Sequence, residues 1–242
     1  MTLIKNQIRV GNWLFRHRSY LPVFMFLLYF YGLNQDLSSN IFQNKYWVIF
    51  CFFISFLGQL IRILTVGKVP NGTSGRNTKN QRATVLNKTG VYSTVRHPLY
   101  LGNYLIWLGL FLLIPILWVQ ILFSLSYWIY YERIMIAEEN FLEEKFGNDY
   151  TAWAKSTPAF LPNLAKYKKN KLKYNFKNIL RREYTSLSAF MILFVVLYHF
   201  NNMYVFKLYS FNKPMTIILI FILLFYIIIR TLKKKTMFFK IN

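Results

Sequence analysis

A cationic residue, an imidazole and a proline stand together directly before an apolar stretch. Residues 91–109 read VYSTVRHPLYLGNYLIWLG, so Arg96, His97 and Pro98 precede a run dominated by Leu, Ile, Tyr and Trp. Two adjacent carboxylates, Glu138 and Glu139, follow in a later segment. Polar groups at an apolar interface need partners, and such clusters are enriched at ligand sites. If the fold brings these two segments together, the chain can bind and orient a small charged molecule there.

The glutamate pair lies in ERIMIAEENFLEEKFGNDY, residues 132–150, which we expect to continue a membrane-spanning helix beyond the membrane. Residues three and four apart share a helix face, so Glu139 lies on a stripe with apolar residues and Glu138 on the next one. Glu143 and Glu144 are expected to face solvent. Gly147 is the expected end of the helix.

The composition indicates which elements carry these residues. The chain has 242 residues, of which 55 % are hydrophobic and 20 % aromatic, a composition typical of proteins with several membrane spans rather than of soluble domains. A span needs about 20 residues, and about 17 at the lower limit. Pro115 predicts a tight turn between two spans. We therefore predict an all-α integral membrane protein with about six spans, near residues 20–33, 46–64, 99–114, 115–131, 186–204 and 214–230.

The charges orient these spans. The formal net charge of +22 favours an anionic partner, and the apolar runs favour a membrane lipid over nucleic acid. Of the 30 Lys and Arg residues, all but Lys45, Lys207 and Lys213 fall in segments on one side of the predicted spans. Because cytoplasmic loops carry the excess of Lys and Arg, both termini are expected in the cytoplasm. We expect a multi-pass protein of a bacterial inner membrane. A single cysteine, Cys51, excludes a disulfide within the chain.

An ordered set of short motifs between about residues 60 and 163 resembles the superfamily of isoprenylcysteine carboxyl methyltransferases and phospholipid methyltransferases. The set comprises GVYSTVRHPLYLGNYL, then EENFLEEKFGNDYTAW, then TPAFLP. Taken singly, His97 fits a helix cap and the glutamates fit a solvated pair, but the order of the motifs favours a site. We divide the chain into an N-terminal span (1–45), a methyltransferase-like core (46–163), and a basic loop with two further spans (164–242).

The resemblance implies a helical membrane enzyme that uses S-adenosylmethionine, with its cofactor pocket at the cytoplasmic face and no metal ion. Carried over by position, it implies the following cofactor-binding residues: Asn77, Thr84, Val85, Leu86, Asn87, Tyr92, His97, Pro98, Leu99, Tyr100 and Glu138. A carboxylate and aromatic rings suit a sulfonium cation, and methyl transfer mainly requires positioning and exclusion of water.

One position departs from the pattern. Relatives that methylate a carboxylate often carry an arginine four residues before the glutamate pair, where this chain has Ile134 and places Arg133 one step away. Arg133 and Glu139 are the candidate catalytic residues, with Glu139 as general base if the acceptor is an amine. Arg76 and Arg96 are candidates for binding the substrate.

The acceptor and the reaction class stay open at this stage. The basic loop at 65–98 favours an anionic, phosphate-bearing lipid headgroup. Phosphatidylethanolamine and prenylcysteine are alternatives within the superfamily. NADPH-dependent sterol reductases of membranes carry a similar Arg-His-Pro-x-Tyr-x-Gly motif, although this chain lacks the cysteine-containing segment that accompanies it. A lipid-binding protein without activity is a third possibility.

Overall fold

The computed structural model describes residues 2–18, 20–34, 44–70, 73, 81–207 and 213–239. Arg76 and Asn77, two of the predicted site residues, lie outside these ranges. The described residues form helices and no named strand, so the predicted all-α architecture of an integral membrane protein is confirmed. The helices are α1 (Leu3–His17), α2 (Leu21–Leu33), α3 (Lys45–Val66), α4 (Pro98–Phe111), α5 (Leu117–Phe146), α6 (Asn148–Ser156), α7 (Phe176–Phe206) and α8 (Lys213–Lys235), with short 3-10 turns at Val91–Ser93 and Leu164–Lys166.

Within the described residues, three helices are long and apolar enough to cross a membrane, namely α3, α7 and α8. Two of the other predicted spans correspond to the shorter apolar helices α2 and α4. The fourth predicted span is the first half of α5, whose second half carries the glutamates. The count of six spans therefore stays a prediction, while the order of the apolar helices agrees with it.

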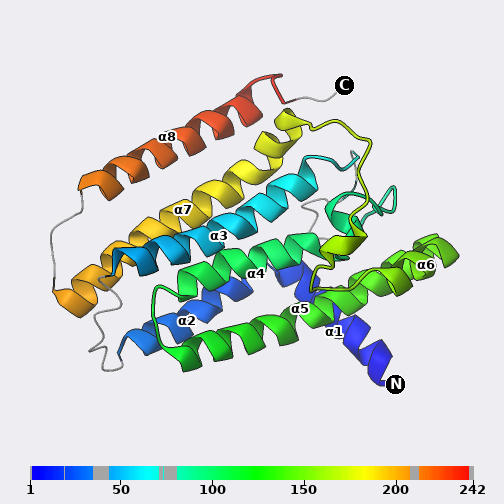
Figure 1. Cartoon of the computed structure of the whole chain (residues 1–242), viewed down its shortest axis with the longest axis horizontal. Helices are drawn as coiled ribbons and strands as arrows, with labels where there is room; N and C mark the ends of the chain where they lie inside the picture. Colours follow the sequence, from blue (N-terminus) through cyan, green and yellow to red (C-terminus); the bar gives the residue numbers. More distant parts are fainter. Residues whose placement is uncertain are drawn as a thin grey trace.

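The apolar helices run side by side, and the segments before α4 and between α6 and α7 lie at one end of the bundle (Figure 1). The ends of α3, α5 and α8 and the beginnings of α4 and α7 all lie toward that end, together with α6. Helix α1 is a separate element that the sequence analysis did not predict. It packs against the second half of α5 and buries Phe15.

Local sequence determines where the helices around the site begin and end. Pro98 occupies the first turn of α4, where its missing N–H leaves no hydrogen bond unmade and its fixed φ suits the helix. Helix α4 ends at Phe111 and α5 starts at Leu117, so the predicted turn at Pro115 is confirmed. Helix α5 ends at Gly147, as predicted, because its φ of +52° is a conformation that glycine adopts without strain. Glu143 and Glu144 are exposed, as predicted.

The close approach of α3 to α4 sets the position of the site. A Cβ atom added at Gly102 of α4 would lie 2.8 Å from the Gly58 carbonyl oxygen and 2.7 Å from Cγ of Arg62, both on α3. These distances are shorter than ordinary van der Waals contact, so the pairing of the two helices requires glycine at this position. Beyond this contact, stacked aromatic rings such as Phe111 and Phe123, with centroids 4.2 Å apart, fill the core between α4 and α5.

We predict that Gly102→Ala destabilises the protein, because the added methyl group forces α3 and α4 apart. Overpacking of this kind typically costs about 1–3 kcal/mol. The measurement is the thermal midpoint of the purified protein in detergent. Ser126→Ala, on an exposed face of α5, is the matched control and should leave the midpoint unchanged. Equal midpoints for Gly102→Ala and the wild type would contradict the close helix contact.

Candidate functional site

The segment before α4 is held in place by the residues that follow α6. The backbone N–H groups of Arg96 and His97 donate to the carbonyl oxygens of Pro158 and Ala159, at 2.8 and 3.1 Å. Nearby, the N–H of Asn163 donates to the carbonyl oxygen of Thr94 at 2.9 Å. The TPAFLP motif at 157–162 thus pairs with the Arg-His motif through the backbone. This pairing fixes the path of the chain into α4 without requiring particular side chains.

The side chains of Arg96 and His97 meet the glutamate pair of α5. Nε2 of His97 lies 2.8 Å from Oε1 of Glu139, and Nε of Arg96 lies 3.0 Å from the same oxygen. Glu138 lies between His97 Nδ1, 3.7 Å from its Oε2, and a terminal nitrogen of Arg18, 4.0 Å from its Oε1. The fold therefore brings the two predicted segments together, and α1 adds a third one through Arg18.

These contacts shift the pKa values of His97 and Glu139. Burial opposes the charged form of His97, but hydrogen bonds and attraction from Glu138 and Glu139 outweigh it and raise the pKa of His97 above its ordinary 6.5. Burial also opposes ionisation of Glu139, and the hydrogen bond from His97 and the charges of His97 and Arg96 outweigh it, so the pKa of Glu139 falls below 4.5. Both shifts favour the charged forms, an imidazolium at His97 and a carboxylate at Glu139.

A cavity of about 730 Å³ lies beside this ion pair, within the range typical of small-molecule sites. Helices α1, α3, α4, α5, α6 and α7 and the 81–87 segment contribute to its wall. Predicted cofactor residues that line it are Val85, Leu86, Asn87, Tyr92, His97, Pro98, Leu99, Tyr100 and Glu138. Tyr100 stacks beside the His97 ring, with ring centroids 5.7 Å apart. Motifs separated in sequence therefore line the same cavity.

The remaining predicted site residues lie differently. Arg96, predicted to bind the substrate, lines the cavity. Thr84, Arg133 and Glu139 are not among the residues that line it. Glu139 holds His97 in place through the contact between its Oε1 and His97 Nε2. Among the described residues, no group of three or more His, Cys, Asp or Glu side chains is placed to hold a metal ion.

Several cavity residues were missed by the sequence analysis, and they come from helices outside the recognised motifs. Phe15 belongs to α1 and Arg18 directly follows that helix. Arg62 belongs to α3, and Arg182 and Glu183 belong to α7. One signal could have pointed to α7. Glu183 is the only acidic residue after Asp149, and it stands just before an apolar run. A lone carboxylate at the edge of a membrane span usually pairs with a charged group or belongs to a functional site.

We predict a pH window for the ion pair. The contribution of His97 to stability is complete below its ordinary pKa of 6.5 and is lost as the pH rises through its raised pKa. The contribution of Glu139 is complete above 4.5 and is lost as the pH falls through its lowered pKa. The difference in thermal midpoint between the wild type and His97→Gln should therefore be largest between pH 4.5 and 6.5.

The other charges that face this pair are Glu138, Arg96 and Arg18, and all of them are retained in His97→Gln. A parallel series on Glu143→Gln, an exposed residue of the same helix, controls for general effects of pH on the detergent-solubilised protein. A difference for His97→Gln that stays constant as the pH rises far above 6.5 would show that the imidazole pairs in its neutral form.

Comparison with known proteins agrees with this geometry. Residues 46–149 match the family model described as phospholipid methyltransferase. No solved structure matches the chain.

Three curated relatives match in part. The cobalt-zinc-cadmium resistance protein CzcN of Cupriavidus metallidurans is 34 % identical over 113 residues, which is 46 % of this chain and 50 % of that protein. The protein-S-isoprenylcysteine O-methyltransferase of Schizosaccharomyces pombe is 32 % identical over 84 residues, 35 % of this chain and 36 % of the enzyme. The nickel-cobalt-cadmium resistance protein NccN of Alcaligenes xylosoxydans is 30 % identical over 113 residues, 44 % of this chain and 53 % of that protein.

The aligned segments thus span about half the length of the two resistance proteins and about a third of the yeast enzyme. The family match covers α3, α4 and α5, which carry His97, Tyr100 and Glu138. Residues 46–149 are therefore similar to the phospholipid methyltransferase family and, in part, to an isoprenylcysteine O-methyltransferase, and these similarities indicate a membrane methyltransferase.

Proposed function

We propose that the protein transfers a methyl group from S-adenosylmethionine to a membrane lipid or lipidated acceptor. The observation that carries this proposal is the cavity beside His97. Residues predicted from three separate motifs line it: residues 85–87, the residues at the start of α4, and Glu138 on α5. If these motifs were unrelated, there would be no reason for all three to line the same cavity. The methyltransferase assignment of residues 46–149 supports the same reading.

The residues around the cavity fit this cofactor. The rings of Tyr92, Tyr100 and Trp153 line the wall together with the carboxylate of Glu138. Aromatic faces and a carboxylate attract a sulfonium or an ammonium group. Asn87 adds a polar residue to the same wall. We assign the cofactor to this end of the cavity, between the start of α4 and the second half of α5.

When bound, this cofactor supplies an activated methyl group: an acceptor lone pair forms the new bond to carbon, and the electrons of the broken C–S bond stay on sulfur. The protein's own residues hold the partners in line and exclude water. His97 is fixed by Glu139 and presents its ring beside Tyr100. Arg96 is fixed by Glu139 and by the carbonyl oxygen of Ala154, 2.8 Å from its guanidinium.

The state of Glu139 bears on the acceptor. Its lowered pKa makes it a weak base, and its Oε1 is already hydrogen-bonded to His97 and ion-paired with Arg96. An amine acceptor that needs a base is therefore poorly served by Glu139, whereas an acceptor oxygen that is already ionised needs none. This favours an anionic acceptor, a phosphate-bearing lipid headgroup above all, over phosphatidylethanolamine. A prenylcysteine carboxylate shares the same charge.

We also propose the orientation and the division of the chain made from the sequence. The end of the bundle that holds α6, the start of α4 and the start of α7 (Figure 1) is also the end where the basic segments lie, which supports a cytoplasmic position for the site and both termini. Neither the family match nor the relatives described above is a reductase, so the NADPH-dependent alternative is not favoured.

Calorimetry with S-adenosylhomocysteine tests the proposal. We predict a dissociation constant on the order of micromolar for the detergent-solubilised wild type, and a loss of at least about tenfold, or ~1.4 kcal/mol, for both His97→Ala and Glu138→Gln. Glu143→Gln, an exposed residue on the same helix, is the matched control and should bind like the wild type. The absence of binding to a folded wild-type protein would refute the methyltransferase proposal.

A further inference from the structure

The cavity extends well beyond the cofactor end, along one face of α4. Tyr100, Asn103 and Trp107 all line it, and their spacing of three and four residues places them on a single stripe. At about 1.5 Å per residue, Trp107 lies about 15 Å from His97 along the axis of α4. The cavity therefore has a second, deeper end, which lies among α3, α4 and α7.

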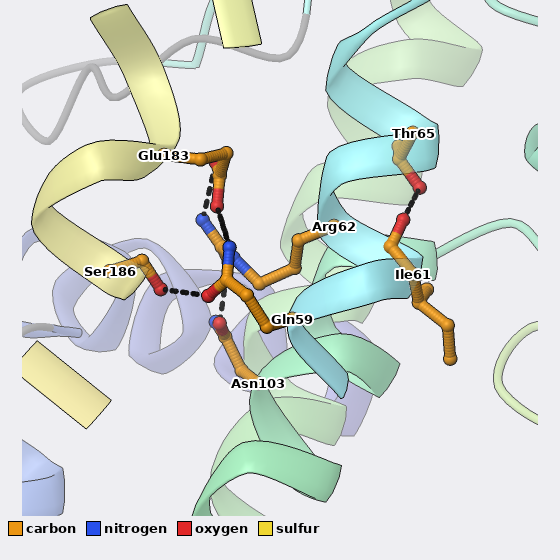
Figure 2. A network of polar contacts seen from close by, with 7 residues as sticks. All are labelled: Gln59, Ile61, Arg62, Thr65, Asn103, Glu183 and Ser186. Carbon is orange, nitrogen blue, oxygen red and sulfur yellow. Dashed lines mark hydrogen bonds and ion pairs between the residues drawn. The ribbon is translucent and has the colours of Figure 1, made fainter. Parts of the chain in front are cut away.

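A network of polar side chains forms the wall of this deep end (Figure 2). Nε and one terminal nitrogen of Arg62 donate to the two carboxylate oxygens of Glu183, at 2.8 and 2.9 Å. Gln59 donates to the same carboxylate at 3.1 Å and accepts a hydrogen bond from Ser186, also at 3.1 Å. The other terminal nitrogen of Arg62 donates to Oδ1 of Asn103 at 2.5 Å. The network joins α3, α4 and α7 and holds the guanidinium in one orientation.

Arg62 nevertheless keeps unused hydrogen-bonding capacity. A guanidinium has five N–H groups, and three of them donate in the network. The side chain also lines the cavity. The network thus leaves over two N–H groups of a residue that lines the cavity. A rigidly held guanidinium suits a phosphate or carboxylate oxygen, because hydrogen bonds between ionised groups are the strong ones.

The charge balance of the cavity agrees with an anionic occupant. Among the described residues that line it there are two glutamates, Glu138 and Glu183, and five arginines, Arg18, Arg62, Arg82, Arg96 and Arg182. This excess of positive charge remains after each glutamate is paired. A cofactor of net positive charge adds to it. An anionic second ligand would lower the electrostatic cost of assembling the complete site.

The apolar part of the deep end indicates a chain attached to that anion. Val66, Trp107 and Ala189 line the cavity beside the network. Burial of hydrocarbon against such residues gains about 0.8 kcal/mol per methylene group. The wall is cationic at Arg62 and apolar at Trp107. This arrangement matches an amphiphile with a negatively charged head.

We propose that the deep end of the cavity is the acceptor site, in which Arg62 binds the anionic head of an amphiphile and Trp107 and Ala189 contact its chain. Glu183 is a positioning residue that holds Arg62. The inference rests on the proposed function for the claim that this ligand receives the methyl group, but the occupancy of the deep end is tested without turnover.

The test is thiol protection in a Cys51→Ser, Ala189→Cys variant. Ala189 is exposed as well as lining the cavity, so a thiol there can react with N-ethylmaleimide. The protein is kept in dodecyl maltoside, a neutral amphiphile, and either dodecyl phosphate or inorganic phosphate is added. We predict that dodecyl phosphate at ten times its dissociation constant slows alkylation about tenfold, since only the free protein reacts. Inorganic phosphate should leave the rate unchanged.

A Cys51→Ser, Ser126→Cys variant, with its thiol on the exposed face of α5, controls for effects of the added detergent on the reagent. Equal protection by inorganic phosphate would overturn the claim that the site binds an amphiphile and would indicate a site for free phosphate. The absence of protection by either compound, or equal slowing at residue 126, would overturn the acceptor site.

The double substitution Arg62→Gln with Glu183→Gln tests the anchor. Both charges are removed together because removal of one leaves the other buried and unpaired. We predict loss of the protection by dodecyl phosphate, with S-adenosylhomocysteine binding retained as evidence of folding. Arg181→Gln, on α7 but not lining the cavity, should keep both. Protection that survives the double substitution would overturn the role of Arg62, whereas failure of the wild type to bind S-adenosylhomocysteine would count against the proposed function alone.

Discussion

The ion pairs of Arg96 and His97 with Glu139 hold the beginning of α4 against the second half of α5. They place three charged groups at the boundary between an apolar helix bundle and water, where each charge is costly without its partner. Because α3 packs on α4 and α1 packs on α5, this one junction also sets the positions of those two helices. The cavity lies among the helices that this junction positions. The carbonyl oxygens of Pro158 and Ala159 reinforce the junction through the backbone.

The cavity has two ends with different origins in the chain. The end beside His97 is lined by Tyr100 and Glu138, which lie within the segment that matches the methyltransferase family. The end beside Arg62 combines that residue, which also lies within the matched segment, with Glu183 and Ala189 of α7, which lies beyond the segment. Such a division is reasonable for a group-transfer protein, because one donor serves many acceptors. Under the proposed function, the shared helices bind the donor, and the helix outside the match selects what is methylated.

Short-range features of the site could be predicted from the sequence. The turn at Pro115 and the end of α5 at Gly147 follow from backbone chemistry that acts locally. The meeting of His97 with the glutamate pair followed from the order of the motifs. The pairing of Arg62 with Glu183 was missed, because the two residues are 121 positions apart and periodicity along one helix says nothing about its neighbour. Helix α1 was missed because its basic residues were attributed to membrane orientation, although the same helix brings Arg18 to Glu138.

The central claim is that one cavity holds a methyl donor at its α4–α5 end and leaves the α7 end for an acceptor. An experimental structure with S-adenosylhomocysteine bound tests this most directly. The account predicts that the ligand contacts Tyr92, Tyr100 and Glu138 and that no part of it reaches Arg62 or Trp107. A ligand seated against Arg62 and Glu183, or one bound outside the cavity, would contradict the account.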